Sequence, residues 1–317
     1  MDASEWQYRP EPGIAIPATV GTQPSSRGEA RKGWQIVQTQ TGDAHALAAS
    51  IHESLQGGAD GVRVDLQNLD DLESDLHTAL APIDLAEVPL EIANGGLLDG
   101  GAILGVAASR GVPTTSLQID RGLDPIGCVA RSGTAPGGVE AHLALTAEQA
   151  LWNTQNAPRC RAFTLDDAVW HDAGADESHC IALQAASGVA LLRAMEAKGL
   201  PLDDAFGQIT FRTSMPGRFL LGIAKLRAAR RIWSRIGELC GVQAHAFHTA
   251  TAATRESTLR DPWVNILRVT SAAFAGIVGG ADRLDTPAFA AGADAARLAR
   301  NTCLLYTSDA ADDNRVV

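Results

Sequence analysis

The sequence has little lysine and no long apolar run. Lysine occurs only at positions 32, 198 and 225, so arginine supplies most of the positive charge. No stretch approaches the eighteen or so consecutive apolar residues of a transmembrane helix. The first residues also lack the basic region and the apolar core of a secretory signal. The sequence therefore predicts neither a membrane span nor secretion.

Positive charge is scarce overall, and the cysteines form no recognisable pattern. Lysine and arginine number 26 against 37 acidic residues, which gives a formal charge of −11 and argues against a nucleic-acid partner. No CxxC and no Cys/His ligand spacing occurs, so we expect no metal site and reduced thiols in a cytoplasmic protein. The five cysteines are Cys128, Cys160, Cys180, Cys240 and Cys303.

Motifs that would name a chemistry are also missing. The sequence contains no GxSxG, HExxH, P-loop or DxHxxG. Its paired glycines do not form the strand-turn-helix pattern GxGxxG. Motifs alone therefore assign no reaction.

What is present is a regular alternation of short β-prone runs and alanine-rich amphipathic stretches. Strand, helix, strand at this spacing indicates parallel β-structure, and six or seven such units without a linker predict a TIM-type barrel over residues 31–302. Residues 1–30 are polar and rich in Pro, Ser, Gly and Thr, which predicts an extended arm. The expected strands are 61–66, 88–93, 114–119, 161–165, 209–212 and 242–247.

Two helices can be predicted in more detail. Over residues 223–236 apolar residues recur at steps of three and four, whereas Lys225 and three arginines fall mainly outside this stripe. This pattern predicts a helix with a buried apolar face and a basic outer face. The second helix should run from Pro262 to Val278, because Asp261 suits the N-cap and glycines follow at 279 and 280.

Two histidines are candidates for acid/base chemistry. His171 follows the expected strand 161–165, and His248 follows the expected strand 242–247, positions where barrel enzymes carry catalytic groups. Satisfying loop hydrogen bonds is the commoner role for such residues, and both interpretations stay open. Acidic residues near strand ends are best explained as helix caps, although paired carboxylates could serve acid/base work. They are Asp65, Asp120, Asp166 and Asp167.

Residues 223–233 (IAKLRAARRIW) resemble the signature helix of the methylmalonyl-CoA mutase family. The resemblance extends over about residues 10–302 and is most similar to the small (beta) subunit of the heterodimeric enzyme. It is carried further by 34–38 (WQIVQ), 171–175 (HDAGA), 261–268 (DPWVNILR), 279–282 (GGAD) and 299–302 (ARNT).

The resemblance implies a TIM barrel that binds an acyl-CoA, with its pantetheine arm along the barrel axis, and a separate C-terminal cobalamin-binding domain. It also implies a reaction, the interconversion of (R)-methylmalonyl-CoA and succinyl-CoA through adenosylcobalamin. In catalytic members a tyrosine, an arginine and histidines stand at positions that this chain fills differently. The replacements are Val37 and Thr39 in the first motif, Val169 before the HDAGA segment, Phe247 in the RTHSQTSG motif and Asp285 in the GGTQSLHT motif.

These losses in separate motifs predict no catalytic residues, with His171 and His248 kept as candidates. The resemblance then implies a non-catalytic small subunit that supports a large (alpha) catalytic partner, which the 1–30 arm would contact. Acyl-CoA would reach the complex through that partner, and adenosylcobalamin would belong to the complex, with none bound to this chain. An anionic Asp285 should in addition repel an anionic CoA ester.

Two alternatives remain. One is a divergent active mutase on a related acyl-CoA, and the other is a binding or chaperone module that has left the mutase complex. Residues 303–317 (CLLYTSDAADDNRVV) resemble translated adaptor sequence and are interpreted as a non-native tail. We therefore expect an incomplete barrel that lacks its eighth strand and the cobalamin domain, with open edges and low stability.

Overall fold

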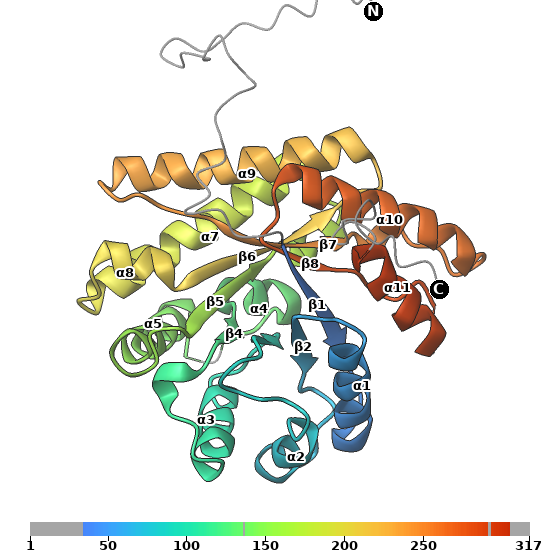
Figure 1. Ribbon diagram of the computed structural model, residues 1–317. Helices are drawn as coiled ribbons and strands as arrows, with labels where there is room; N and C mark the ends of the chain where they lie inside the picture. The colour runs from blue at the N-terminus through green and yellow to red at the C-terminus, as the bar shows by residue number, and fades with distance from the viewer. Residues whose placement is uncertain (1–33, 136, 291–292, 305–317) are drawn as a thin grey trace, which may run out of the picture. The chain divides into compact units, whose positions relative to one another are not determined.

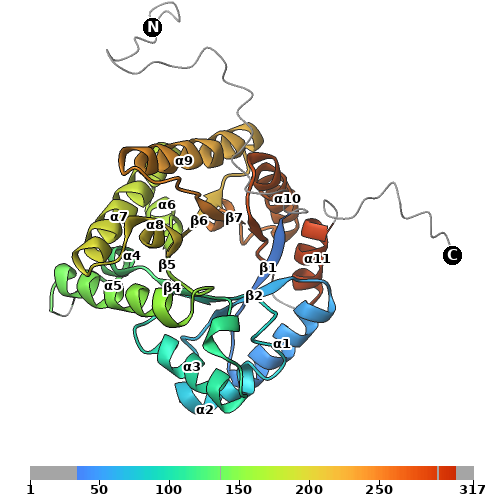
Figure 2. The same ribbon diagram turned by 60° about the vertical axis from the view of Figure 1, so that its left-hand side comes forward.

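The chain folds into a closed parallel β/α barrel. The computed structural model describes residues 34–135, 137–290 and 293–304, which belong to one compact unit. Eight parallel strands follow one another around the barrel in sequence order, and β8 pairs with β1 to close it. Figures 1 and 2 show the helices arranged around this ring. The strands are β1 (Gln35–Gln40), β2 (Gly61–Asp65), β3 (Leu90–Ala93), β4 (Ile119–Leu123), β5 (Arg161–Asp166), β6 (Ile209–Met215), β7 (Phe247–Ala252) and β8 (Arg283–Asp285).

The helices cover the outside of the strands. The first half of the chain contributes α1 (Ala44–Gln56), α2 (Leu72–Ala79), α3 (Asp99–Ser109), the 3-10 turn η2 (Thr114–Ser116), α4 (Pro125–Ser132) and α5 (Val139–Asn156). The second half contributes α6 (Ala168–Asp172), α7 (Glu177–Ala197), α8 (Leu202–Gly207), α9 (Phe219–Leu239), η3 (Thr254–Glu256), α10 (Pro262–Gly279) and α11 (Ala293–Leu304).

The barrel class is confirmed, but the expected loss of the eighth strand is wrong. β8 has only three residues, and Arg283, Leu284 and Asp285 pair with β1 and β7 on its two sides. Such a short strand with two charged residues carries no hydrophobic alternation, so the sequence pattern does not show it. The open edges on which low stability was predicted are therefore not there.

Several strand bounds also differ from the prediction. β7 begins at Phe247, five residues beyond the expected start, and β4 begins at Ile119, where the expected strand ended. β1 was not expected as a strand because its glutamines and threonine interrupt the apolar pattern. The helix expected over residues 262–278 is confirmed as α10, and Asp261 caps it through the backbone N–H of Trp263.

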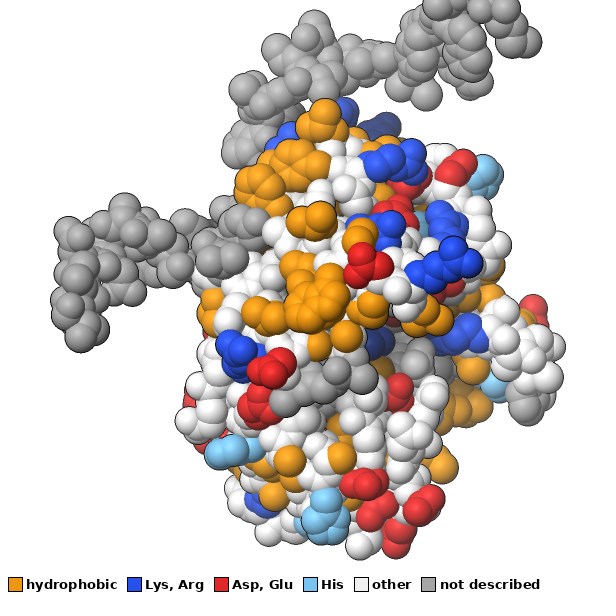
Figure 3. Space-filling model, turned by 90° about the vertical axis from the view of Figure 1, so that its right-hand side faces the viewer, with side chains coloured by type: hydrophobic (Ala, Val, Ile, Leu, Met, Phe, Trp, Pro, Cys, Tyr) orange, Lys and Arg blue, Asp and Glu red, His pale blue; other side chains and the backbone are white. Residues whose placement is uncertain are grey.

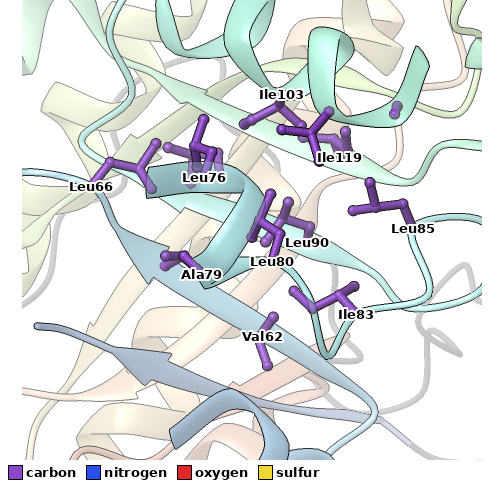
Figure 4. Packing of buried hydrophobic residues seen from close by; sticks show 14 of the residues in the cluster. Val62, Leu66, Leu76, Ala79, Leu80, Ile83, Leu85, Leu90, Ile103 and Ile119 are labelled. Atoms are coloured by element: carbon purple, nitrogen blue, oxygen red, sulfur yellow. The ribbon is translucent and has the colours of Figure 1, made fainter. Parts of the chain in front are cut away.

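Hydrophobic side chains on the outer side of the strands pack under the helices. Figure 4 shows one such region, where Leu76 of α2 and Leu80, which directly follows this helix, pack over Val62 of β2 and Leu90 of β3. A second cluster centres on β5 and β6, with Trp233 of α9 against Phe211 at a ring distance of 4.9 Å. The apolar core therefore lies between strands and helices, whereas charged side chains face the barrel axis.

Helix α7 is long and apolar enough to cross a membrane by length and composition alone. In the described part of the chain it lies in the helix layer, where it contacts α5, α9 and β5. The side-chain amide of Gln184 donates to the carbonyls of Leu165 and Arg212, at 2.9 and 2.8 Å. Packing within the barrel accounts for the apolar composition of this helix.

The predicted arm over residues 1–30 lies outside the described residues. Most of the predicted tail, 305–317, does too, although α11 includes Cys303 and Leu304. Cys303 is buried in the cluster formed by β1, β7, β8 and α10. The interpretation of 303–317 as a non-native tail stays a prediction.

Candidate functional site

The inside of the barrel holds charged side chains where a packed barrel normally carries branched apolar ones. Alternate residues on each strand point to the axis, and on six of the eight strands these residues include acids and arginines. We call this set the lumen network. Its members are Arg63, Glu91, Asp120, Arg161, Asp166, Arg212, Arg283 and Asp285.

The upper part of the lumen network is centred on Arg212 of β6. Its guanidinium pairs with Asp285 of β8 and lies 3.7 Å from Glu91 and 3.6 Å from Asp166. Arg63 of β2 donates from Nε to Glu91 at 2.9 Å. Burial alone would lower the pKa of Arg212, but Asp285, Glu91 and Asp166 together raise it above its usual range. Arg212 is therefore held fully charged inside the barrel.

The lower part of the lumen network lies at the amino-terminal ends of the strands. Arg283 pairs with Asp120, and Arg161 lies 3.7 Å from the same carboxylate. The guanidinium of Arg161 lies 4.2 Å from the ring centroid of Phe247, and that of Arg283 lies 4.8 Å from it. Asp120, weighed above as a helix cap, is thus an interior ion-pair partner, because its side chain points to the axis.

Four acids and four arginines make up the lumen network, so it is formally neutral. Taking charges out of water is costly, and the mutual attraction of the charges offsets this cost only where the geometry is good. Arginine suits this task because its planar fork can bind two carboxylates at once. The network fills the axis with long side chains anchored to opposite walls of the barrel.

Positions singled out in separate sequence motifs meet within this lumen. The backbone N–H and the hydroxyl of Thr39 both donate to Asp285, at 3.2 and 2.5 Å. Val37 pairs in register with Asp285, and Phe247 lies under the arginines of the lower part. Arg212 pairs with Asp285, so this carboxylate does not stand in the lumen without a counter-charge. Its expected repulsion of an anionic ester stays a prediction.

A hollow opens at the carboxyl ends of β2 to β5. Its volume is about 220 Å³, open solvent included. Its wall includes Arg63, Thr164 and Asp166, which belong to or adjoin the lumen network. The hollow therefore ends on the charged side chains and does not continue down the axis.

Gly122 and Asp124 shape one side of this hollow. Gly122 has φ of +67°, and an added Cβ would lie 1.9 Å from the carbonyl oxygen of Ile92, so only glycine fits there. The pairing of β4 with β5 shifts register around this residue. Asp124 caps α4 by accepting from the N–H of Gly127 at 2.8 Å, and burial raises its pKa to about 6.

His171 lies in α6 and is completely buried. Nη2 of Arg255 is 3.1 Å from its Nε2, and since arginine can only donate, Nε2 is the acceptor. Burial lowers the pKa of His171, and the charges of Lys225 and Arg255 lower it further. The imidazole is therefore neutral, and its Nε2 is bound to Arg255.

His248 faces away from the barrel axis. Its ring stacks on Phe211 at 5.0 Å and lines a hollow between β6, β7 and the helices α7 and α9. Nδ1 lies 2.9 Å from the hydroxyl of Thr213. Complete burial lowers its pKa to about 3, with the charge of Arg230 adding to the effect. The structure thus separates the two candidate histidines, and neither points into the lumen.

Lys225 was expected on the outer face of its helix but is fully buried. Its Nζ lies 2.7 Å from Asp167 Oδ2 and donates to the carbonyl of Ser214 at 2.7 Å. The other oxygen of Asp167 accepts the N–H of Ser214 at 2.6 Å. The pair joins α9 to the carboxyl ends of β5 and β6. The prediction fails because a lysine on the apolar face becomes tolerable once a buried carboxylate neutralises it.

The remaining acids divide between roles. Asp166 does act as a local cap, accepting the N–H of Ala168 at 3.0 Å, and its other oxygen faces the lumen network. Asp65 accepts the N–H of Gln67 in the turn after β2. In the described ranges no group of three or more His, Cys, Asp or Glu side chains is arranged to hold a metal ion.

Comparison with known proteins agrees with this architecture and with the sequence motifs. The family model for methylmalonyl-CoA mutase matches residues 58–312. The chain belongs to the methylmalonyl-CoA mutase family.

Its relatives within this family include proteins named as small subunits. The methylmalonyl-CoA mutase small subunit of Streptomyces virginiae is 32% identical over 308 residues, which are 94% of this chain and 49% of the relative. The small subunit of Propionibacterium freudenreichii subsp. shermanii is 31% identical, over 89% of this chain and 45% of the relative. The chain therefore spans about half the length of these mutase relatives. The resemblance on which the sequence analysis relied is confirmed.

Analysis of the sequence missed most of the lumen network. Glu91, Arg212 and Arg283 stand within short strands, where single charges look like ordinary interruptions of an apolar run. The signal that could have revealed the lumen network was the presence of charged residues at inward positions on many strands. Using it requires the strand register, which the sequence pattern does not supply for β7 and β8.

Proposed function

We propose that this chain is the non-catalytic small subunit of a heterodimeric, adenosylcobalamin-dependent methylmalonyl-CoA mutase. In this proposal the large subunit interconverts (R)-methylmalonyl-CoA and succinyl-CoA, and this barrel supports it. The observation that carries the proposal is the lumen network. An extended pantetheine arm needs an open axis, and here Arg212 and Arg283 cross it, bound to Asp285 and Asp120.

Adenosylcobalamin would supply radical chemistry to the complex. The resemblance places cobalamin in a separate C-terminal domain and not in the barrel, and no step is derived through the cofactor. The cofactor would bind to the complex outside this barrel.

The proposal extends to partner and compartment. The names of the relatives support a large subunit as the partner. The arm over residues 1–30 would contact that subunit. All five cysteines are free thiols, which supports the reducing cytoplasm as the location.

Two measurements test the proposed function. Titration of the full chain with succinyl-CoA in a calorimeter should give no binding heat. Mutase turnover should be absent with the chain alone and present when the large subunit is added. The matched control is His171→Ala, which should leave the activity of the complex within twofold of wild type. Turnover by this chain alone, abolished by His171→Ala, would establish the divergent active mutase instead.

A further inference from the structure

Three polar side chains from different elements are buried around one hollow. Gln184 of α7, Trp233 of α9 and His248 of β7 all line the space between α7, α9, β6 and β7, which we call the α7–α9 hollow. Figure 3 shows histidine and charged side chains at the surface of one face, where solvent can bind them. The three side chains of the hollow are instead only 3, 2 and 1% exposed.

Each of these side chains has one polar atom without a hydrogen-bond partner among the described residues. The atoms are Oε1 of Gln184, the indole Nε1 of Trp233 and the imidazole Nε2 of His248. Buried polar groups in proteins are almost always hydrogen-bonded, either to the protein or to an ordered water. Three such atoms on the side chains that line one hollow therefore indicate a bound molecule that they share.

The amide of Gln184 has only one favourable orientation. Its Nε2 donates to the carbonyls of Leu165 and Arg212, at 2.9 and 2.8 Å. Turning the amide over would place Oε1, which can only accept, against these two carbonyl oxygens. The unpartnered atom of Gln184 is therefore fixed as an acceptor.

The two ring systems are also held in place. Nδ1 of His248 lies 2.9 Å from the hydroxyl of Thr213, which leaves Nε2 on the other side of the ring. In Trp233 the atoms Cζ3 and Cη2 lie against Gly188, where an added Cβ would come within 2.6 and 2.7 Å of them. Nε1 belongs to the other part of the indole, and it can only donate. The hollow thus has one donor, one acceptor and an imidazole nitrogen that can be either.

This combination selects a neutral molecule that both donates and accepts hydrogen bonds. An ammonium ion has no lone pair for the N–H of Trp233, and a chloride ion has no hydrogen for Oε1 of Gln184. Either ion would also lose its hydration on entering this buried space. Water can accept from Trp233, donate to Gln184 and still pair with either tautomer of a neutral His248. The space in the hollow admits about one water molecule.

We propose that the α7–α9 hollow is a binding site for a single water molecule, held by Trp233, Gln184 and His248. The water accepts from Nε1 of Trp233, donates to Oε1 of Gln184 and pairs with Nε2 of His248. It connects two helices of the outer layer to a strand of the barrel through hydrogen bonds, in addition to their apolar contacts. This inference concerns the barrel itself and does not rest on the proposed function.

Nuclear magnetic resonance of the isotope-labelled full chain tests the site in solution. Wild-type protein should give a rotating-frame Overhauser cross-peak between water and the indole N–H of Trp233, which Trp233→Phe identifies among the six tryptophans. Ala185→Leu enlarges an apolar side chain on the wall of the hollow and should abolish this cross-peak. Ala182→Leu is the matched control, because Ala182 is exposed on the same helix, and should leave the cross-peak unchanged.

A crystal structure of the wild-type chain gives an independent measurement. Density for one water should lie at hydrogen-bond distance, about 2.7 to 3.2 Å, from all three atoms. A hollow with neither density nor cross-peak overturns the proposal, whether or not the variants fold. So does a cross-peak that persists in an Ala185→Leu variant melting within a few degrees of wild type, because Trp233 would then meet water elsewhere. An anomalous signal in the hollow after a bromide soak would identify an anion site and also overturn it.

Discussion

Arg212 of β6 and Asp285 of β8 form an ion pair inside the barrel, across the intervening strand β7. The same carboxylate accepts both donors of Thr39 on β1, so one acid ties together three strands that are distant in sequence. Charged pairs therefore occupy the interior of the barrel, and their contribution to stability can be measured.

Removing one partner of the central pair should be costly. Arg212→Met leaves Asp285 and Glu91 buried without their cation, and we expect a loss of about 3–5 kcal/mol in the free energy of unfolding. Arg235→Met is the control, since Arg235 pairs with Glu238 on the exposed side of α9 and should change stability by less than about 1 kcal/mol. Denaturant unfolding measures both. Equal effects of the two substitutions would show that the lumen network is not closed to water.

Removing one partner of the buried pair Lys225–Asp167, which lies outside the lumen, should also be costly. Lys225→Met leaves Asp167 buried, and burial already raises the pKa of this carboxyl. We expect a loss of about 3–5 kcal/mol. A second substitution, Asp167→Asn, should recover part of this loss, because an amide buries no charge. Lys198→Met, which removes a partly exposed partner of Glu148, should cost about 1 kcal/mol or less and serves as control.

His248 should make the protein sensitive to moderate acid. Its folded-state pKa of about 3 lies below the unfolded value of about 6.5, so the unfolded chain takes up a proton first as the pH falls. Stability is complete above pH 6.5 and declines between pH 6.5 and 3, by about 2 kcal/mol at pH 5. The decline from pH 7.5 to 5 should be about 2 kcal/mol smaller in His248→Gln.

The exposed His52 provides the comparison for this measurement. His52→Gln should follow the wild-type stability profile between pH 7.5 and 5. A wild-type-like decline in His248→Gln would mean that the imidazole of His248 reaches solvent.

The contribution of Asp124 to stability should change with pH in the opposite direction to that of His248. Burial raises its pKa in the folded state to about 6, above the unfolded value near 4, so the folded chain holds the proton more tightly. Its contribution favours folding below pH 4 and is lost as the pH rises from 4 to 6. Asp124→Asn keeps an oxygen for the Gly127 N–H and removes the charge. Relative to wild type, the variant should gain about 2 kcal/mol between pH 4.5 and 7.5.

Asp43 is the matched control, because it caps α1 in the same way but is exposed, accepting the N–H of Ala46 at 2.9 Å. Asp43→Asn should show no such relative gain with pH. Urea unfolding at several pH values measures both variants. An Asp124→Asn profile parallel to wild type would contradict the burial argument.

The sequence predicted those parts of the fold that hydrophobic periodicity controls. The run 161–165 and the helix starting at Pro262 follow their patterns closely, because apolar residues and an N-cap specify them locally. β8 escaped prediction because two of its three residues are charged and their partners lie on other strands. β1 escaped because Gln38 and Gln40, whose partners lie on α1 and α11, interrupt its apolar pattern. Only the closed barrel brings Arg283 to Asp120.

The candidate site, too, could be predicted from the sequence only in part. Family motifs identified Thr39 and Asp285 as replaced positions, and the structure brings these two side chains into contact. Their common partner Arg212 carried no motif, so the sequence suggested lost chemistry without showing what fills the space. Lys225 was assigned to the wrong face because periodicity treats every lysine as a surface residue.

The three-residue strand β8 also determines the order in which the barrel can fold. Arg283 contacts Gln35, a residue 248 positions earlier, so the last strand closes a loop that contains almost the whole barrel. Such closure is a late and entropically costly step. Until it occurs, Asp120 lacks Arg283 and Arg212 lacks Asp285, so both stay more hydrated than in the closed barrel. During synthesis on the ribosome, the interior of this barrel therefore remains wet until its final strand has emerged.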